Sequence, residues 1–78
     1  MARKTYRYHF KMGRKTMYSG ITDDLEQRER ELKRKFGEDG YIKQVGGATS
    51  LDVALVWESE QAKRGYLTRR RLVRRAVK

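Results

Sequence analysis

The sequence contains no cysteine, no proline and only one histidine. Without cysteine the chain can form no disulfide, no thiolate metal site and no thiol nucleophile. A single histidine also leaves no set of side chains for a stable zinc site. These absences exclude disulfide-stabilised scaffolds, zinc-binding domains and thiol-dependent enzymes.

Long apolar runs are missing as well. No stretch approaches the roughly 18 consecutive apolar residues of a membrane-spanning helix, and no signal-peptide pattern opens the chain. The sequence therefore predicts a soluble, cytoplasmic protein without a membrane partner. Its 78 residues suffice for one domain, because chains usually divide only above roughly 150 residues. We expect a folded domain over residues 1–65 and a basic helix or tail over residues 66–78.

Positive charge is abundant and unevenly placed. The net charge is +10, with six basic residues and no acid in residues 1–22, and eight basic residues and no acid in residues 63–78. Such segregation favours polyanions through counterion release and electrostatic steering. We therefore expect a nucleic-acid partner, and a solvated basic surface is the plainer alternative. The basic side chains expected to contact the phosphate backbone are Arg14, Lys15, Arg69, Arg70, Arg71, Arg74 and Arg75.

A hairpin is predicted at the start of the chain. Residues 5–11 alternate aromatic with polar side chains, as a half-buried strand does. Gly13 marks a turn, and residues 16–21 suit the returning strand. The turn can hold two or three residues, and this choice sets the register between the strands. Three aromatic side chains share one face of the first strand: Tyr6, Tyr8 and Phe10. His9 points the other way, which predicts an exposed side chain.

The first helix is predicted over residues 23–36. Thr22, Asp23 and Asp24 are candidate N-caps, and Glu26 is placed to complete a capping box from Asp23. Its apolar stripe is formed by Leu25, Leu32 and Phe36. Between them, where helical periodicity predicts further apolar side chains, stand Arg28 and Glu29. An arginine that faces the core usually has a fixed anion beside it, so Arg28 is a candidate for a functional site or for a structural ion pair.

A second helix should begin after Thr49 or Ser50 and continue to about Arg64. Its apolar stripe is formed by Leu51, Ala54, Leu55 and Ala62, with Val56 and Trp57 on its other sides. These side chains predict that the helix is well enclosed. Glu58 falls within the stripe, where an unpartnered carboxylate would cost several kcal/mol or take up a proton. Glu58 should therefore border a cleft, bind a metal or meet a cation, and an Arg28–Glu58 salt bridge is the structural alternative.

A short third strand is predicted over residues 41–46, ending at the pair Gly46-Gly47. The element order is then β-β-α-β-α, which predicts an α+β fold with a three-stranded antiparallel sheet and two packed helices. Beyond Gly65, apolar side chains at helical spacing among arginines suit either a short third helix or a basic tail.

Several short motifs, taken together, resemble the GIY-YIG endonuclease family. The first strand carries Tyr8 in Tyr-x-Tyr-His-Phe, and residues 18–25 are Tyr-Ser-Gly-Ile-Thr-Asp-Asp-Leu. Arg28 stands one turn into the following helix, as the family's arginine does. Glu58 completes an Ala-x-x-x-Glu pattern similar to that of the family's metal-binding glutamate. The resemblance covers roughly residues 5–62 and selects the same two charged residues that the helical periodicity selects.

The resemblance implies metal-assisted hydrolysis of a DNA phosphodiester at a site formed by Tyr8, Tyr18, Arg28 and Glu58. Glu58 would be the one protein ligand of a Mg²⁺ or Mn²⁺ ion, which keeps several waters. Arg28 would neutralise charge on the phosphoryl oxygens. Tyr8 would orient or deprotonate the attacking water, the second role requiring a lowered pKa, and Tyr18 would hold the phosphate or assist proton transfer. Gly20 would let the backbone approach the site closely.

The chain departs from the family pattern at three places. The first motif lacks the usual Gly-Ile/Val-Tyr, and Leu32 stands where many members have a histidine one turn after the arginine. No residue matches the asparagine that some members carry after the glutamate. These departures support a second hypothesis, a module that binds nucleic acid without cleaving it. A third hypothesis is a small interaction or structural protein whose charges serve only solvation. A nuclease domain of this size would leave targeting to a partner protein.

The implied chemistry places a strict demand on the hairpin. Tyr8 and Tyr18 must point from the same face of the sheet, and a three-residue turn centred on Gly13 would pair them across the two strands. A two-residue turn at Gly13 and Arg14 would instead send their hydroxyls to opposite faces. The resemblance therefore requires the three-residue turn.

Overall fold

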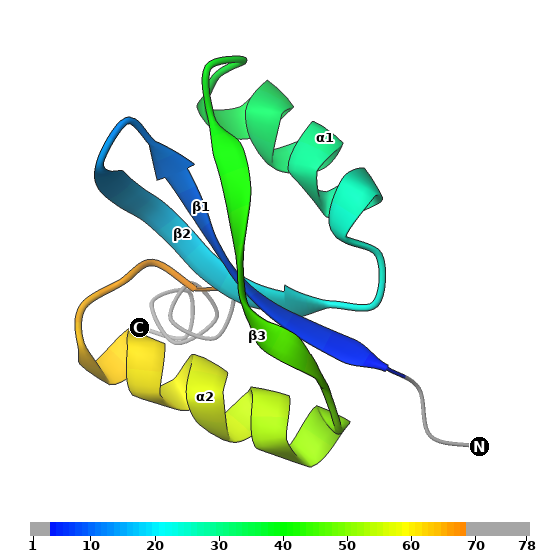
Figure 1. The fold of residues 1–78 in the computed structure, drawn as a ribbon. Helices are drawn as coiled ribbons and strands as arrows, with labels where there is room; N and C mark the ends of the chain where they lie inside the picture. Colours follow the sequence, from blue (N-terminus) through cyan, green and yellow to red (C-terminus); the bar gives the residue numbers. More distant parts are fainter. Residues whose placement is uncertain (1–3, 69–78) are drawn as a thin grey trace.

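The structure, a computed structural model, describes residues 4–68, which form three strands and two helices (Figure 1). In chain order these are β1 (Thr5–Met12), β2 (Lys15–Thr22), α1 (Leu25–Phe36), β3 (Tyr41–Thr49) and α2 (Leu51–Lys63). The strands form one antiparallel sheet in the order β2-β1-β3. The predicted α+β fold and element order are confirmed. The part of the predicted helix or tail after residue 68 lies outside the described residues.

Both helices begin at a side-chain cap. The carboxylate of Asp24 accepts a hydrogen bond from the Gln27 N–H at 3.1 Å and caps α1. Asp24 is one of the three predicted N-caps, and the helix begins at Leu25, two residues later than predicted. Ser50 caps α2 as predicted, because its hydroxyl accepts a hydrogen bond from the Val53 N–H at 3.4 Å. Neither of these two helices has the length and apolar character needed to span a membrane.

One face of the sheet packs against α1 and forms the apolar core. Tyr8 and Phe10 of β1 both point to this face, because alternate residues of a strand point the same way, and both are buried. Leu32 is buried on α1. The ring centre of Phe36 lies 5.9 Å from that of Phe10 and 6.1 Å from that of Tyr18. The predicted apolar stripe of α1 is thus confirmed.

The other face of the sheet packs against α2, on the side opposite α1 (Figure 1). The ring centre of His9 lies 5.3 Å from that of Trp57 and 5.6 Å from that of Tyr66. Its Nδ1 lies 2.7 Å from the Ser19 hydroxyl oxygen, in a hydrogen bond. The prediction of an exposed His9 is therefore wrong, because Trp57 of α2 and Tyr66 after it pack against the His9 ring.

The buried side of α2 differs from the predicted stripe. Its buried residues are Ala54, Glu58 and Gln61. Leu51 and Leu55 are 54% and 38% exposed and Val56 is 61% exposed, so the predicted enclosure of the helix is wrong. The helix is turned so that the small side chain of Ala54 meets the sheet. Glu58 is nevertheless buried, as helical periodicity predicted.

The third strand is longer than predicted. The expected end at Gly46 is wrong, since β3 continues to Thr49. The register with β1 shifts between the pairs Arg7–Val45 and Thr5–Thr49. Gly46 has a φ of +63°, a backbone conformation that favours glycine. This glycine therefore allows an irregularity inside the strand and does not end it.

Candidate active site

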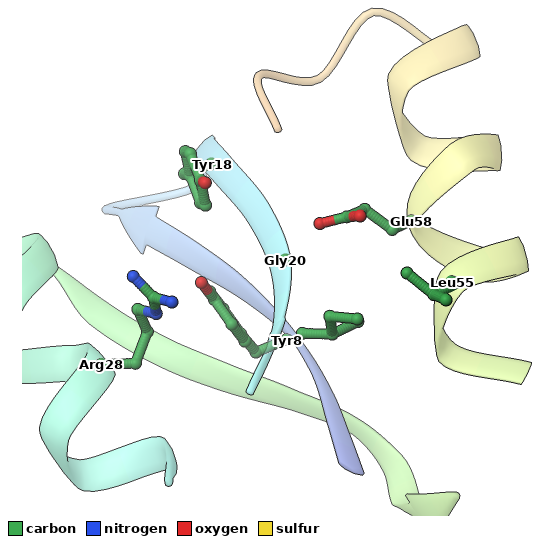
Figure 2. A pocket seen from close by; sticks show the side chains of 7 residues that line it. Tyr8, Tyr18, Gly20, Arg28, Leu55 and Glu58 are labelled. Carbon is green, nitrogen blue, oxygen red and sulfur yellow. The ribbon is translucent and has the colours of Figure 1, made fainter. Parts of the chain in front are cut away.

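The four residues selected from the sequence come from four different elements and line one cavity. Tyr8 lies on β1, Tyr18 on β2, Arg28 on α1 and Glu58 on α2. All four surround a cavity of about 170 Å³ (Figure 2). Arg28 and Glu58 approach it from opposite sides, with the Tyr8 hydroxyl between them in this view. The structure therefore brings together every residue of the predicted catalytic set.

The hairpin aligns the two tyrosines by a route that the sequence did not predict. Its turn has two residues, Gly13 and Arg14, one of the two lengths left open by the sequence, whereas the resemblance required three. On its own this turn would place Tyr8 and Tyr18 on opposite faces of the sheet. A β-bulge at Met17 inserts one extra residue into β2, which reverses the face of the residues that follow.

As a result, Tyr8 lies opposite Gly20 and Tyr18 lies opposite Phe10. The two tyrosines are diagonal neighbours on one face, with ring centres 6.5 Å apart and ring planes inclined by 21°. The expected direct pairing of Tyr8 with Tyr18 is therefore wrong, but the two side chains do share a face. Tyr8 is 1% exposed and Tyr18 7% exposed, so both rings belong to the core as well as to the cavity wall.

Gly20 leaves space for the Tyr8 hydroxyl. A β-carbon at Gly20 would lie 2.6 Å from the hydroxyl oxygen of Tyr8, 2.9 Å from its Cζ and 3.2 Å from Cε1 of Tyr18. The first two separations are steric clashes, so a side chain here would displace the Tyr8 ring. The close backbone approach expected at Gly20 is therefore present.

Tyr8 carries a neutral hydroxyl in the folded chain. Burial raises its pKa well above the ordinary value of 10.0; the Arg28 charge opposes this shift, and Tyr18, Glu58 and Glu31 add to it. A general base would need a lowered pKa, and the surrounding residues supply the opposite. At neutral pH Tyr8 can therefore donate or accept a hydrogen bond, which suits it to orient a water or contact a phosphate oxygen.

Arg28 lies at the partly exposed side of the cavity. Its Nη1 is 3.1 Å from Oε1 of Glu31, and the two side chains are 32% and 48% exposed. Among residues 4–68 the ion pair of Arg28 is thus within its own helix and not with Glu58. An exposed pair of this kind contributes only about 0.2–1 kcal/mol, so an anion in the cavity can compete for the guanidinium. Glu29 instead accepts a hydrogen bond from the Ile42 N–H of β3 at 2.9 Å, which explains its place in the apolar stripe.

Glu58 is the carboxylate of the cavity and is 7% exposed. The described part of the chain holds no group of three or more His, Cys, Asp or Glu side chains that could enclose a metal ion. A single carboxylate beside two phenol oxygens fits a hard divalent cation such as Mg²⁺, which takes oxygen ligands and retains several waters. The same donor set does not fit Zn²⁺, whose sites use three or four protein ligands.

Two residues that line the cavity, Ile21 and Leu55, were missed as site residues. Leu55 precedes Glu58 by three positions and therefore lies on the same side of α2, a spacing that could have placed it beside the carboxylate. Ile21 belongs to the motif that contains Gly20, but nothing in its residue type indicates a cavity. These apolar side chains complete the wall between the polar groups.

The remaining residues selected from the sequence lie elsewhere. Arg14 and Lys15 are exposed at the hairpin turn and are not part of the cavity wall. Leu32, at the position of the family's histidine, is 4% exposed and packs in the apolar core. The arginines predicted to contact a phosphate backbone at positions 69–75 lie outside the described residues.

Comparisons with known proteins add no family. No model of a protein family, no curated protein sequence and no solved structure matches the chain. The function of the cavity therefore has to follow from its own residues.

Proposed function

We propose that this protein is a metal-dependent endonuclease that hydrolyses phosphodiester bonds of DNA at a site of the GIY-YIG type. The observation that carries the proposal is the convergence of Tyr8, Tyr18, Arg28 and Glu58 on one cavity, from four separate elements. A guanidinium and a carboxylate on opposite sides of two phenols suit a phosphodiester bound beside a divalent cation. The net charge of +10 adds long-range attraction for a polyanion.

Arg28 supplies the phosphate-binding group in this proposal. Its planar guanidinium can donate two parallel hydrogen bonds to phosphate oxygens. Leaving Glu31 costs little, because that ion pair is exposed to solvent. A guanidinium already in place stabilises the negative charge that grows on the phosphoryl oxygens as the bond breaks.

The other three side chains position the reacting groups. Tyr8 is protonated at neutral pH, since burial raises its pKa further above the ordinary value of 10.0, so it orients the attacking water by a hydrogen bond. Tyr18, with its ring centre 6.5 Å from that of Tyr8, holds a phosphate oxygen. Glu58 holds the divalent cation with one carboxylate. When bound there, Mg²⁺ or Mn²⁺ supplies Lewis-acid polarisation of the phosphate and a lowered pKa for water.

Cleavage of branched, nicked and plain DNA in the presence of Mg²⁺ or Mn²⁺ tests the proposal. Glu58→Gln keeps the size of the side chain but removes its charge, so the cleavage rate should fall about 100-fold or more. Glu60→Gln is a matched control on the exposed side of the same helix and should cleave as the wild type does. Equal cleavage by the wild type and Glu58→Gln would refute the proposal.

A module that binds nucleic acid without cleaving it is the second candidate, and one observation favours it. With Glu58 assigned to the metal, the general base that the resemblance implies would be Tyr8, and burial raises the pKa of Tyr8 instead of lowering it. Leu32 takes the place of the family's histidine and packs in the core. This candidate predicts salt-dependent DNA binding that survives Glu58→Gln, without cleavage by the wild type in either metal.

A further inference from the structure

A group of cations lies on the face of the sheet that points away from Tyr8. Lys11 follows His9 by two positions on β1, so the two side chains share this face. Lys43 of β3 pairs directly with His9 across the strands. Arg64 is the C-cap of α2 and stands two residues before Tyr66, whose ring centre lies 5.6 Å from that of His9. Three elements thus bring three cations to one histidine.

The charges of these three cations also act on the His9 ring. Burial lowers the pKa of His9, and the charges of Lys11, Lys43 and Arg64 lower it further. No carboxylate within residues 4–68 forms an ion pair with any of the three cations. Like charges held near one another without a counterion repel, so an anion bound among them would be stabilised.

An exposed aromatic ring stands beside this group. Tyr41 of β3 pairs with Lys11 of β1 and is 42% exposed. Its hydroxyl donates a hydrogen bond to the Gly13 carbonyl oxygen at 3.2 Å, which holds the ring against the hairpin turn. Proteins that bind single-stranded nucleic acid combine cations for the phosphates with aromatic rings on which the bases stack.

We infer that Lys11, Tyr41, Lys43 and Arg64 form a binding surface for a single strand of nucleic acid. The three cations contact phosphates along the strand, and an unpaired base stacks on Tyr41. A duplex fits less well, because its bases already stack on one another and do not reach the ring. The surface is independent of the proposed nuclease chemistry, since it lies on the His9 face of the sheet and shares no residue with the cavity.

Fluorescence anisotropy with a labelled single-stranded oligonucleotide tests the contribution of the ring. Tyr41→Ala should weaken binding about tenfold, the loss typical of one stacked base. Tyr41→Phe removes the hydrogen bond to Gly13 but keeps the ring, so it should bind within about threefold of the wild type. Equal binding by the wild type and Tyr41→Ala would overturn the stacking role.

The cations are tested by the salt dependence of the same binding. The double variant Lys11→Gln/Lys43→Gln should lower the slope of log K against log salt by about 1.4, because each phosphate contact in a single strand contributes about 0.7. Arg30→Gln/Arg34→Gln removes the same charge from the exposed side of α1 and is the matched control, with a much smaller change. Circular dichroism establishes that each variant is folded.

Two outcomes would overturn the inference. Equal changes of slope in the two double variants would mean that net charge alone attracts the strand. Tighter binding to a duplex of the same sequence than to the single strand would contradict the stacking of an unpaired base. The cleavage assay tests Glu58 in the cavity, whereas anisotropy without divalent metal tests Lys11, Tyr41 and Lys43, which do not line the cavity. Failure of the nuclease proposal and failure of this inference are therefore distinguishable.

Discussion

Replacing Gly20 with alanine should destabilise the fold through the Tyr8 ring. The added methyl group would lie 2.6 Å from the Tyr8 hydroxyl oxygen and 2.9 Å from its Cζ. Tyr8 is 1% exposed and stacks on Tyr18, so its ring cannot swing aside without moving the core. Overpacking of this kind costs about 1–3 kcal/mol.

Thermal unfolding followed by circular dichroism measures this cost. In a domain of this size each 1 kcal/mol lowers Tm by about 4–8 °C, so Gly20→Ala should lower Tm by about 4–24 °C. Gly47→Ala is the matched control, because no atom lies within 4 Å of the position of its β-carbon. Its Tm should stay within about 3 °C of the wild-type value.

A double variant separates the clash from any effect on the backbone. Tyr8→Phe removes the hydroxyl oxygen of the shortest contact and leaves the ring in place. Gly20→Ala/Tyr8→Phe should therefore be more stable than the sum of the two single effects predicts. A Gly20→Ala protein that unfolds at the wild-type temperature would show that the Tyr8 hydroxyl does not lie over Gly20, and the geometry of the proposed site would be wrong.

Three further predictions concern titration and packing. Because the folded pKa of Tyr8 is raised, its stabilising contribution is present at neutral pH and is lost as pH rises past 10.0, the ordinary value. A spectrophotometric titration should show one tyrosine that ionises late, and Tyr8→Phe should remove it. An unchanged titration curve in Tyr8→Phe would contradict this prediction. Because the folded pKa of His9 is lowered, the unfolded chain takes up the proton first as pH falls below 6.5. Stability should therefore decline as pH falls through 6.5, and the decline in Tm should be smaller in His9→Gln. Equal declines would count against the assignment. Leu32 is 4% exposed, so Leu32→Ala should lower the free energy of unfolding in urea by about 2–5 kcal/mol, and a loss below about 1 kcal/mol would mean that Leu32 is not a core residue.

The sequence predicts α1 and the Tyr8 face of β1 well, because these two surfaces pack against each other. The alternation through Tyr8 and Phe10 and the spacing of Leu32 and Phe36 then match the buried positions. For α2 the same reasoning fails in part, because apolar residues such as Leu51 and Val56 lie on several sides of the helix. The fit of the helix against the sheet decides which of these sides is buried, and helical periodicity does not contain that information.

Some features of the candidate site could be predicted from the sequence and others could not. Arg28 and Glu58 could be found from sequence, because a charge within an apolar stripe is visible in the periodicity. The protonation of Tyr8 could not, since it depends on burial by residues distant in the chain. The bulge in β2 could not be predicted either, because Met17 is not a glycine and nothing around it marks an extra residue. The grouping of Lys11 with Lys43 likewise depends on strand pairing.

The bulge at Met17 has a consequence for the length of the hairpin turn. Together with the two-residue turn, the bulge keeps the Tyr18 side chain on the same face of the sheet as the Tyr8 side chain. Surface turns usually accept insertions of any size. One residue inserted into this turn would move the β2 side chains to the opposite faces of the sheet unless the bulge were lost as well. Two inserted residues would leave each side chain on its present face. Natural or engineered insertions in this turn should therefore contain an even number of residues, or an odd number together with loss of the bulge in β2.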